Sequence, residues 1–219
     1  MANILLYSGT NDGYCASGLG TFASARSHAG SIADSNNNYD VNAIHHTYYS
    51  GRGTHTLRRA FFEFDTSDID NAPSYATLII SGVTNGDGDV IVVRSEQGGT
   101  LAAGDFNSFP AAAVTALGNS DGSGAGTLAG VSNFTYSAEV TTWSTTTYTY
   151  IQLNSLALSD MATLDLFKVC IMNHDRDYLD IVATSTEING LRWAEVGGIR
   201  RPTLSYTQAV PATFFGANF

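Results

Sequence analysis

Lysine is almost missing from this chain. Lys168 is the only lysine, and lysine and arginine together number 10 against 20 aspartates and glutamates, so the formal net charge is −10 at pH 7. A protein that binds nucleic acid needs a basic face to neutralise phosphates. The arginines are single or form isolated pairs, at residues 58–59 and 200–201, and no basic cluster is present in the sequence. We therefore exclude DNA and RNA as partners.

Long apolar runs are also missing. No stretch approaches the roughly 20 residues that span a bilayer, and the N-terminal MANILLYSGTNDGY has no basic region before its short apolar part, so we expect neither a membrane anchor nor a secretory signal.

Cys15 and Cys170 are the only cysteines. Their separation does not identify a disulfide. We expect two reduced thiols, packed or idle, in a protein made in a reducing cytoplasm.

Charged side chains are scarce as well. They make up 14% of the residues, whereas hydrophobic ones make up 43%, and ordinary globular chains carry roughly 25% charged residues. Threonine, serine, asparagine, glycine and tyrosine take the place of lysine and glutamate. This mixture is typical of strands and glycine-containing loops, so the composition predicts a strand-rich fold with a sizeable core.

Short apolar runs separated by turn signals predict about ten strands. Only residues 111–117 are predicted as a convincing helix, with Asn107 or Ser108 as its cap and Gly118 as its end. A parallel sheet would need a helix between most strands. The sequence therefore predicts an all-β fold, an antiparallel β-sandwich of the jelly-roll kind with one short helix.

The clearest strand is LRRAFFEFD at residues 57–65, where aromatic residues dominate an alternating pattern typical of a half-buried strand. A DTS turn and the strand ATLIIS at residues 76–81 follow it, and residues 199–207 read IRRPTLSYT, which resembles the closing strand of a β-sandwich family. In this order the motifs resemble the DNRLRE-type, CBM96-like β-sandwich family, which is known from secreted carbohydrate-binding modules and phage virion proteins. The resemblance implies a β-sandwich and permits both roles.

We expect one domain over residues 1–208. Residues 18–38 are rich in glycine, alanine, serine and asparagine and predict a long loop or an arm that becomes ordered against a neighbour. Residues 209–219, AVPATFFGANF, form an aromatic tail beyond the last strand. Such a tail has little reason to stay in water. We expect Phe214, Phe215 and Phe219 at subunit contacts, with folding back onto the tail's own sandwich as the alternative.

One stretch resembles a calcium loop. Asn85, Asp87 and Asp89 occupy positions 1, 3 and 5 of that pattern, and Glu96 occupies position 12. Val90, however, stands where the loop requires glycine for its sharp turn. An asparagine–glycine step between two apolar runs is also the strongest short-range hairpin signal. We therefore favour a hairpin turn over a cation site.

The densest polar cluster is NHDRD at residues 173–177. An imidazole and two carboxylates, those of His174, Asp175 and Asp177, could bind a metal or transfer protons. The alternative, which we favour, is a turn whose side chains bond its own backbone while Arg176 pairs with a carboxylate. We expect no bound cofactor, and as metal ligands these aspartates, like those of the calcium-like loop, are weak candidates.

Histidines and aromatic residues leave further alternatives open. His45 and His46 are expected to point to opposite faces of a strand, one buried and one exposed, which suits joint metal ligation poorly. Trp143, Trp193 and the eleven tyrosines could stack on sugars. Cores and subunit interfaces use the same residues, however.

The sequence contains none of the G-x-S-x-G, H-E-x-x-H or P-loop motifs of common enzymes, and we predict a non-enzymatic protein. The prediction is a phage virion structural protein, a capsid decoration (cement) or appendage subunit that binds neighbouring virion proteins and forms a homo-oligomer. It would be located in the virion and assembled in the host cytoplasm. The alternative is a carbohydrate-binding module or receptor-binding adhesin for a surface polysaccharide.

Overall fold

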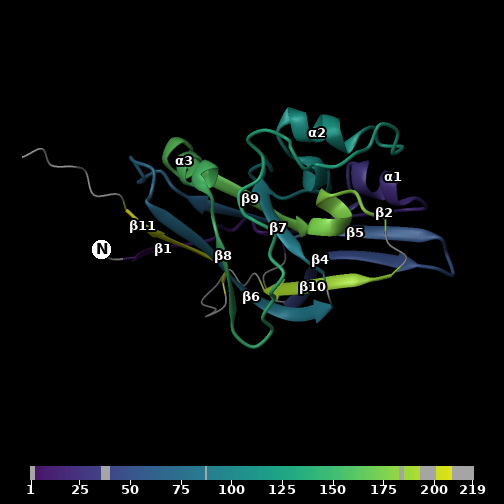
Figure 1. The fold of residues 1–219 in the computed structure, drawn as a ribbon, viewed down its shortest axis with the longest axis horizontal. Coiled ribbons are helices and arrows are strands. Elements are labelled where there is room, and N and C mark those ends of the chain that lie inside the picture. Colours follow the sequence, from purple (N-terminus) through teal and green to yellow (C-terminus); the bar gives the residue numbers. More distant parts are fainter. Residues whose placement is uncertain (1–2, 36–39, 87, 183–184, 193–200, 209–219) are drawn as a thin grey trace, which may run out of the picture.

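The structure is a computed structural model that describes residues 3–35, 40–86, 88–182, 185–192 and 201–208, with the backbone alone at residues 40–45. The strands are β1 (Asn3–Tyr7), β2 (Gly13–Leu19), β3 (Ile32–Asp34), β4 (Asp40–Tyr49), β5 (Thr54–Asp65), β6 (Tyr75–Gly86), β7 (Val90–Arg94), β8 (Tyr148–Gln152), β9 (Leu166–Asn173), β10 (Glu187–Arg192) and β11 (Thr203–Thr207). The helical segments are α1 (Phe22–Ser27), the 3₁₀-helix η1 (Ala103–Asn107), α2 (Ala111–Leu117), α3 (Ser155–Thr163) and the π-helix η2 (His174–Tyr178). The prediction of an all-β fold is confirmed (Figure 1).

All eleven strands belong to one antiparallel sheet, whose main path runs β1-β11-β6-β10-β4-β5-β2-β3. The long strand β6 joins two parts of this path, because its first half pairs with β11 and β8 and its second half with β10. From β5 the sheet continues through β9 to β7, and isolated bridges then link β7 to residues 135 and 140 and Ser137 to Leu153 beside β8. The pairings thus form a circuit. The finer expectation, a jelly-roll sandwich, stays a prediction.

Two hydrophobic clusters lie on opposite faces of β5, β7 and β9. Phe62 and Phe64 of β5 face the first, which also contains residues of β6, β8 and β11. Phe61 faces the second, which is closed by residues of α1, η1 and α2. The alternation predicted for this strand is therefore present. Both of its faces are buried, however, so β5 is a central strand and the expectation of a half-buried one was wrong.

Helices are more numerous than predicted. α2 spans the predicted residues 111–117 and ends at Gly118, whose φ of 81° favours glycine. Its N-cap residue is Pro110, whereas Asn107 or Ser108 was expected. α1 was not predicted, whereas α3 spans residues 155–163, for which the sequence indicates one or two helical turns. Thr21 and Asn154 cap the two helices by accepting hydrogen bonds from backbone amides. In Figure 1, α1 and α2 lie on the same side of the molecule.

The expected arm at residues 18–38 is part of the body as far as it is described. The end of β2, α1 and β3 lie within it, and Phe22, Ala25 and Arg26 of α1 are buried. Asn107 fixes the end of α1, because its side-chain amide donates to the carbonyl oxygens of Ser27 and His28 at 2.6 and 2.9 Å. The high content of glycine, alanine, serine and asparagine favoured a loop prediction for a segment that contains a short amphipathic helix. The expectation of a loop or arm was therefore wrong for residues 18–35, and residues 36–38 lie outside the described chain.

The predicted hairpin at residues 85–89 is also absent from the described part of the chain. β6 and β7 flank this connection, but β6 pairs with β10, β11 and β8, whereas β7 pairs with β9. The connection therefore crosses between different parts of the sheet, which a local turn signal cannot reveal.

Both cysteines are free and buried in the second cluster, as expected of packed thiols. Burial, with the nearby charge of Asp105, raises the pKa of Cys15 to about 12, and burial also raises the pKa of Cys170 well above its ordinary value. Neither thiol is therefore an activated nucleophile. Among the described residues, no helix has the length and apolar character needed to cross a membrane.

Candidate functional site

Asp177, one of the proposed metal ligands, belongs to a buried ion pair. Its carboxylate accepts two hydrogen bonds from Arg59, each 2.6 Å long, and both side chains are at most 1% exposed. Arg26 lies 3.7 Å away on the same carboxylate and donates to the Asp177 backbone oxygen at 2.5 Å. Asp177 thus shares one negative charge between two buried guanidinium groups, and Arg26 has a second carboxylate partner in Asp180 at 3.5 Å. Its role is structural, so this weak metal-ligand candidate is not supported. The favoured interpretation of residues 173–177 as a turn agrees with the structure, because the Arg176 amide donates to Asn173 Oδ1 at 2.7 Å and the Arg176 side chain pairs with Glu187.

The surroundings of Arg59 complete this network. Its remaining hydrogen bonds go to the carbonyl oxygens of Phe106 and Arg26 and to the Asn107 side chain, at 2.6 to 3.0 Å. The guanidinium also lies over the Phe106 ring, 3.9 Å from its centre. The network therefore ties β5 to α1, η1 and η2, and it explains how the protein buries two arginines.

The other predicted ligands converge in part. Asp175 and His174 follow β9, and Glu139 reaches them from a neighbouring segment, so that the His174 Nδ1 atom lies 3.0 Å from the Asp175 carboxylate and 3.1 Å from that of Glu139. One donor atom from each residue lies within 4.8 Å of the others. An imidazole and two carboxylates could hold a divalent metal such as zinc. We call these three residues the histidine–carboxylate cluster.

Asp89 lies beside this cluster. Its backbone oxygen accepts a hydrogen bond from the amide of His174 at 2.8 Å. Burial, followed by the charge of Glu139, a hydrogen bond with Glu139 and the charge of Asp175, raises the pKa of the Asp89 carboxyl. Two of the four predicted candidates, Asp89 and Asp175, therefore lie together. Asp87 lies outside the described residues, as do Phe214, Phe215 and Phe219.

Glu139 was missed because it lies far from the others in sequence. The bridge between Val90 and Val140 places Glu139 next to Asp89. The sequence around residue 139 contains no pattern that predicts this pairing. Asn85, the first residue of the calcium-like pattern, is used differently, since its side-chain amide donates to the Trp143 oxygen at 3.2 Å. The structure thus brings no calcium loop together from residues 85 and 89.

The histidines and tryptophans proposed for binding are largely structural. His46 is buried and its Nε2 atom lies 3.0 Å from Nδ1 of His55, beside Phe22. The side chain of His45 lies outside the description. Trp143 is buried, with its indole N–H donating to the Gly190 oxygen at 3.0 Å, and Trp193 lies outside the described residues.

The outward side of β1, β11, β6 and β8 carries exposed tyrosines, while Thr77, Ser81 and Thr203 within it are buried. The registers align side chains across these strands in rows, which comprise Tyr7, Thr203, Ile79 and Tyr150; Leu5, Ser205, Thr77 and Gln152; Asn3, Thr207 and Tyr75; and Ser81 with Tyr148. None of these residues carries a charge. Tyr150 is 65% exposed, Tyr7 56% and Tyr75 46%. We call this surface the tyrosine face.

A groove of about 300 Å³ borders the tyrosine face beside β8. It separates β8 from residues 138–142, and Glu139, Tyr150 and Gln152 contribute to its walls. The groove therefore connects the tyrosine face with the histidine–carboxylate cluster, because Glu139 belongs to both the groove and the cluster.

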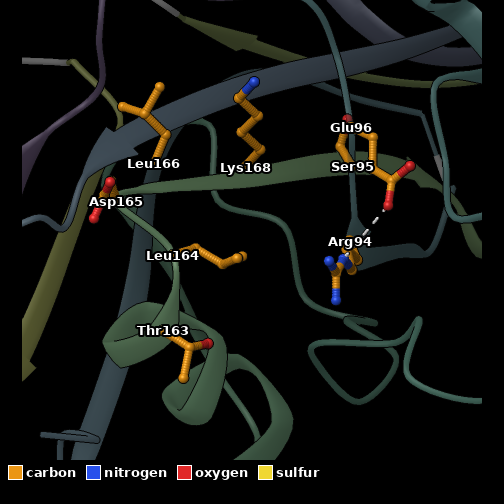
Figure 2. A pocket seen from close by; sticks show the side chains of 8 residues that line it. All are labelled: Arg94, Ser95, Glu96, Thr163, Leu164, Asp165, Leu166 and Lys168. Atoms are coloured by element: carbon orange, nitrogen blue, oxygen red, sulfur yellow. Dashed lines mark ion pairs between the residues drawn. The ribbon is translucent and has the colours of Figure 1, made fainter.

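A second pocket, of about 520 Å³, lies between the end of α3 and the ends of β7 and β9 (Figure 2). It gathers Arg94 and Lys168, but both cations already have partners. Arg94 lies 3.9 Å from the Glu96 carboxylate and 3.4 Å from that of Asp160, and Lys168 donates to a backbone oxygen at 2.7 Å. These contacts hold the pocket walls together and leave the tyrosine face as the better candidate site.

The sequence matches no protein-family model, and no curated protein is significantly similar to it.

Proposed function

We propose that this protein is a non-enzymatic structural subunit of a phage virion, most simply a capsid decoration or appendage protein that binds neighbouring virion proteins. The observation that supports this proposal is the tyrosine face. A surface whose strand residues are uncharged and whose tyrosines are exposed is suited to bind another protein, because tyrosine contributes a large contact area at little entropic cost. In a chain of net charge −10 such a surface is conspicuous.

Antibody labelling tests this proposal directly. An antibody against the recombinant chain should decorate virus particles purified from the host that produces the protein, and mass spectrometry of those particles should detect the chain at many copies per particle. A chain found only in the lysate supernatant, with unlabelled particles, would contradict the proposal.

Deletion of residues 209–219 should separate folding from assembly. The described strands and both hydrophobic clusters lie before this tail. We therefore expect the free energy of unfolding of the truncated chain to lie within about 0.5 kcal/mol of that of the full chain, and we expect the truncated chain to lose its binding to virus particles. Urea unfolding and co-sedimentation with particles measure the two properties. A truncated chain that unfolds would show that the tail belongs to the core.

A second candidate function is binding of a surface polysaccharide. The observation in its favour is that Gln152, Ser205 and Thr207, which reach the solvent, lie among the tyrosines of the tyrosine face, and that the groove beside Tyr150 adds a carboxylate from Glu139. Flat aromatic rings cover the apolar side of a sugar while such polar groups bond its hydroxyls.

For this second function, Tyr150→Ala should weaken binding to a responding glycan at least tenfold, because the most exposed ring of the face is lost. Tyr49→Ala is the matched control, since Tyr49 is 56% exposed on β4 and lies outside the tyrosine face. A glycan array followed by calorimetry measures both variants. Equal affinities, or an array without any response, would remove the polysaccharide from consideration.

A further inference from the structure

β1 is an edge strand with exposed apolar side chains on both of its sides. Ile4 is 40% exposed, Leu5 49% and Tyr7 56%. Over the described ranges its only strand partner is β11, and the register between the two contains no shift. Natural sheet edges are usually protected by a charge, a proline or a bulge. β1 contains none of these, so its edge is suited to receive another strand.

The pairing with β11 shows which backbone groups of β1 face outward. The amide of Ser8, directly after β1, donates to the Pro202 oxygen at 3.1 Å, so this residue bonds toward β11. Inward and outward groups alternate along an antiparallel strand. The N–H and C=O groups of Asn3, Leu5 and Tyr7 therefore point to the free edge.

We propose that this edge binds the same edge of a second copy of the chain, so that two β1 strands pair antiparallel about a two-fold axis at Leu5. Each Leu5 then lies opposite its own copy, and Asn3 lies opposite Tyr7 of the partner subunit. Every such pair exchanges two backbone hydrogen bonds. The contact is self-complementary, as a two-fold interface must be, and it joins the two tyrosine faces into one continuous surface.

The charge distribution argues for a second copy as the occupant. A chain of net charge −10 repels its own copies over much of its surface. β1 and β11 carry no charged residue, and the Arg201 guanidinium, which lies 5.9 Å from the centre of the Tyr7 ring, is at the end of β1. Two copies can therefore meet around Leu5 without opposing charges at the axis. Pairing also covers Ile4 on one side of the strand and Leu5 on the other. The biological role of this dimer rests on the proposed assembly function, but the dimer itself can be measured without a virion.

Sedimentation equilibrium of the full chain tests the proposal. The wild-type chain should show a monomer–dimer equilibrium, and Leu5→Lys should raise the dimer dissociation constant at least tenfold by placing two cations opposite each other on the axis. Leu5→Pro should do the same, because it removes only an N–H that points to the free edge. Circular dichroism should confirm that both variants keep the fold.

Ile32→Lys is the matched control. Ile32 is 50% exposed on β3, which lies at the other end of the sheet path, so this variant should dimerise like the wild type. A wild-type chain that stays monomeric, or a dimer that survives both Leu5 variants, would overturn the proposal. So would a monomer that dimerises only after deletion of residues 209–219, since the tail would then occupy the edge. Particle labelling is independent of these results, so the virion proposal can fail while the dimer stands.

Discussion

Asp177→Asn is expected to lower the free energy of unfolding by about 3–5 kcal/mol, the usual cost of removing one partner from a buried ion pair. Asp177 is the carboxylate that lies against both Arg59 and Arg26, whose side chains are fully buried. The amide would leave the Arg59 guanidinium without its carboxylate partner and would leave Arg26 with Asp180 alone, whose carboxylate lies 3.5 Å away. Burial lowers the pKa of Arg26, more than the charge of Asp177 raises it, but no arginine deprotonates readily. Urea unfolding at pH 7 measures the loss.

Arg52→Met provides the control for a lost charge. Arg52 is exposed in the turn between β4 and β5, so its replacement should change the free energy of unfolding by less than about 0.5 kcal/mol. If Asp177→Asn lowers the free energy of unfolding as little as this control, water or another acidic side chain must reach the two arginines. The network would then not stabilise the packing of β5 against the helices.

Acid should destabilise the protein through the paired histidines. Burial, and then the proximity of His55, lower the pKa of His46 from 6.5 to about 4, and burial lowers the pKa of His55. The unfolded chain therefore binds protons between pH 6.5 and about 4 that the folded chain does not. By linkage, stability is complete above pH 6.5 and falls as the pH is lowered through this window. The loss from His46 should be about 2–3 kcal/mol.

Unfolding free energies measured in urea at half-unit steps from pH 7.5 to 4 would reveal this loss. In His46→Gln the same curve should lose most of its slope in the window, even if the variant is less stable at pH 7, because the glutamine does not titrate. A variant that follows the wild-type slope would assign the acid sensitivity to another group, such as His55, whose pKa burial also lowers.

The sequence predicted those features that depend on local pattern. α2 spans the predicted residues, and the alternation around Phe62 was correct because a strand presents side chains with a period of two. α1 was predictable in principle, since Thr21 is a good cap and Phe22, Ala25 and Arg26 share one helical face. The high content of glycine and serine around it obscured that signal.

The polar sites were less accessible from the sequence, because they depend on pairings between distant segments. Arg59 and Asp177 are 118 residues apart, and neither position carries a mark of its partner. The same holds for Glu139, which reaches His174 only through the bridge from Val90 to Val140. The dense polar cluster at residues 173–177 was visible in the sequence, but its members divide between two places. Asp177 belongs to the buried ion pair, whereas His174 and Asp175 belong to the histidine–carboxylate cluster.

The order of the strands has a consequence for biosynthesis. β1 leaves the ribosome first among the described strands, whereas its partner β11 comes last. Until then the nascent chain displays both edges of an apolar strand, and a pairing over such a separation forms slowly. Cells that produce this protein are thus expected to protect the emerging N-terminal segment, and crowded polysomes are where premature contacts between chains would arise.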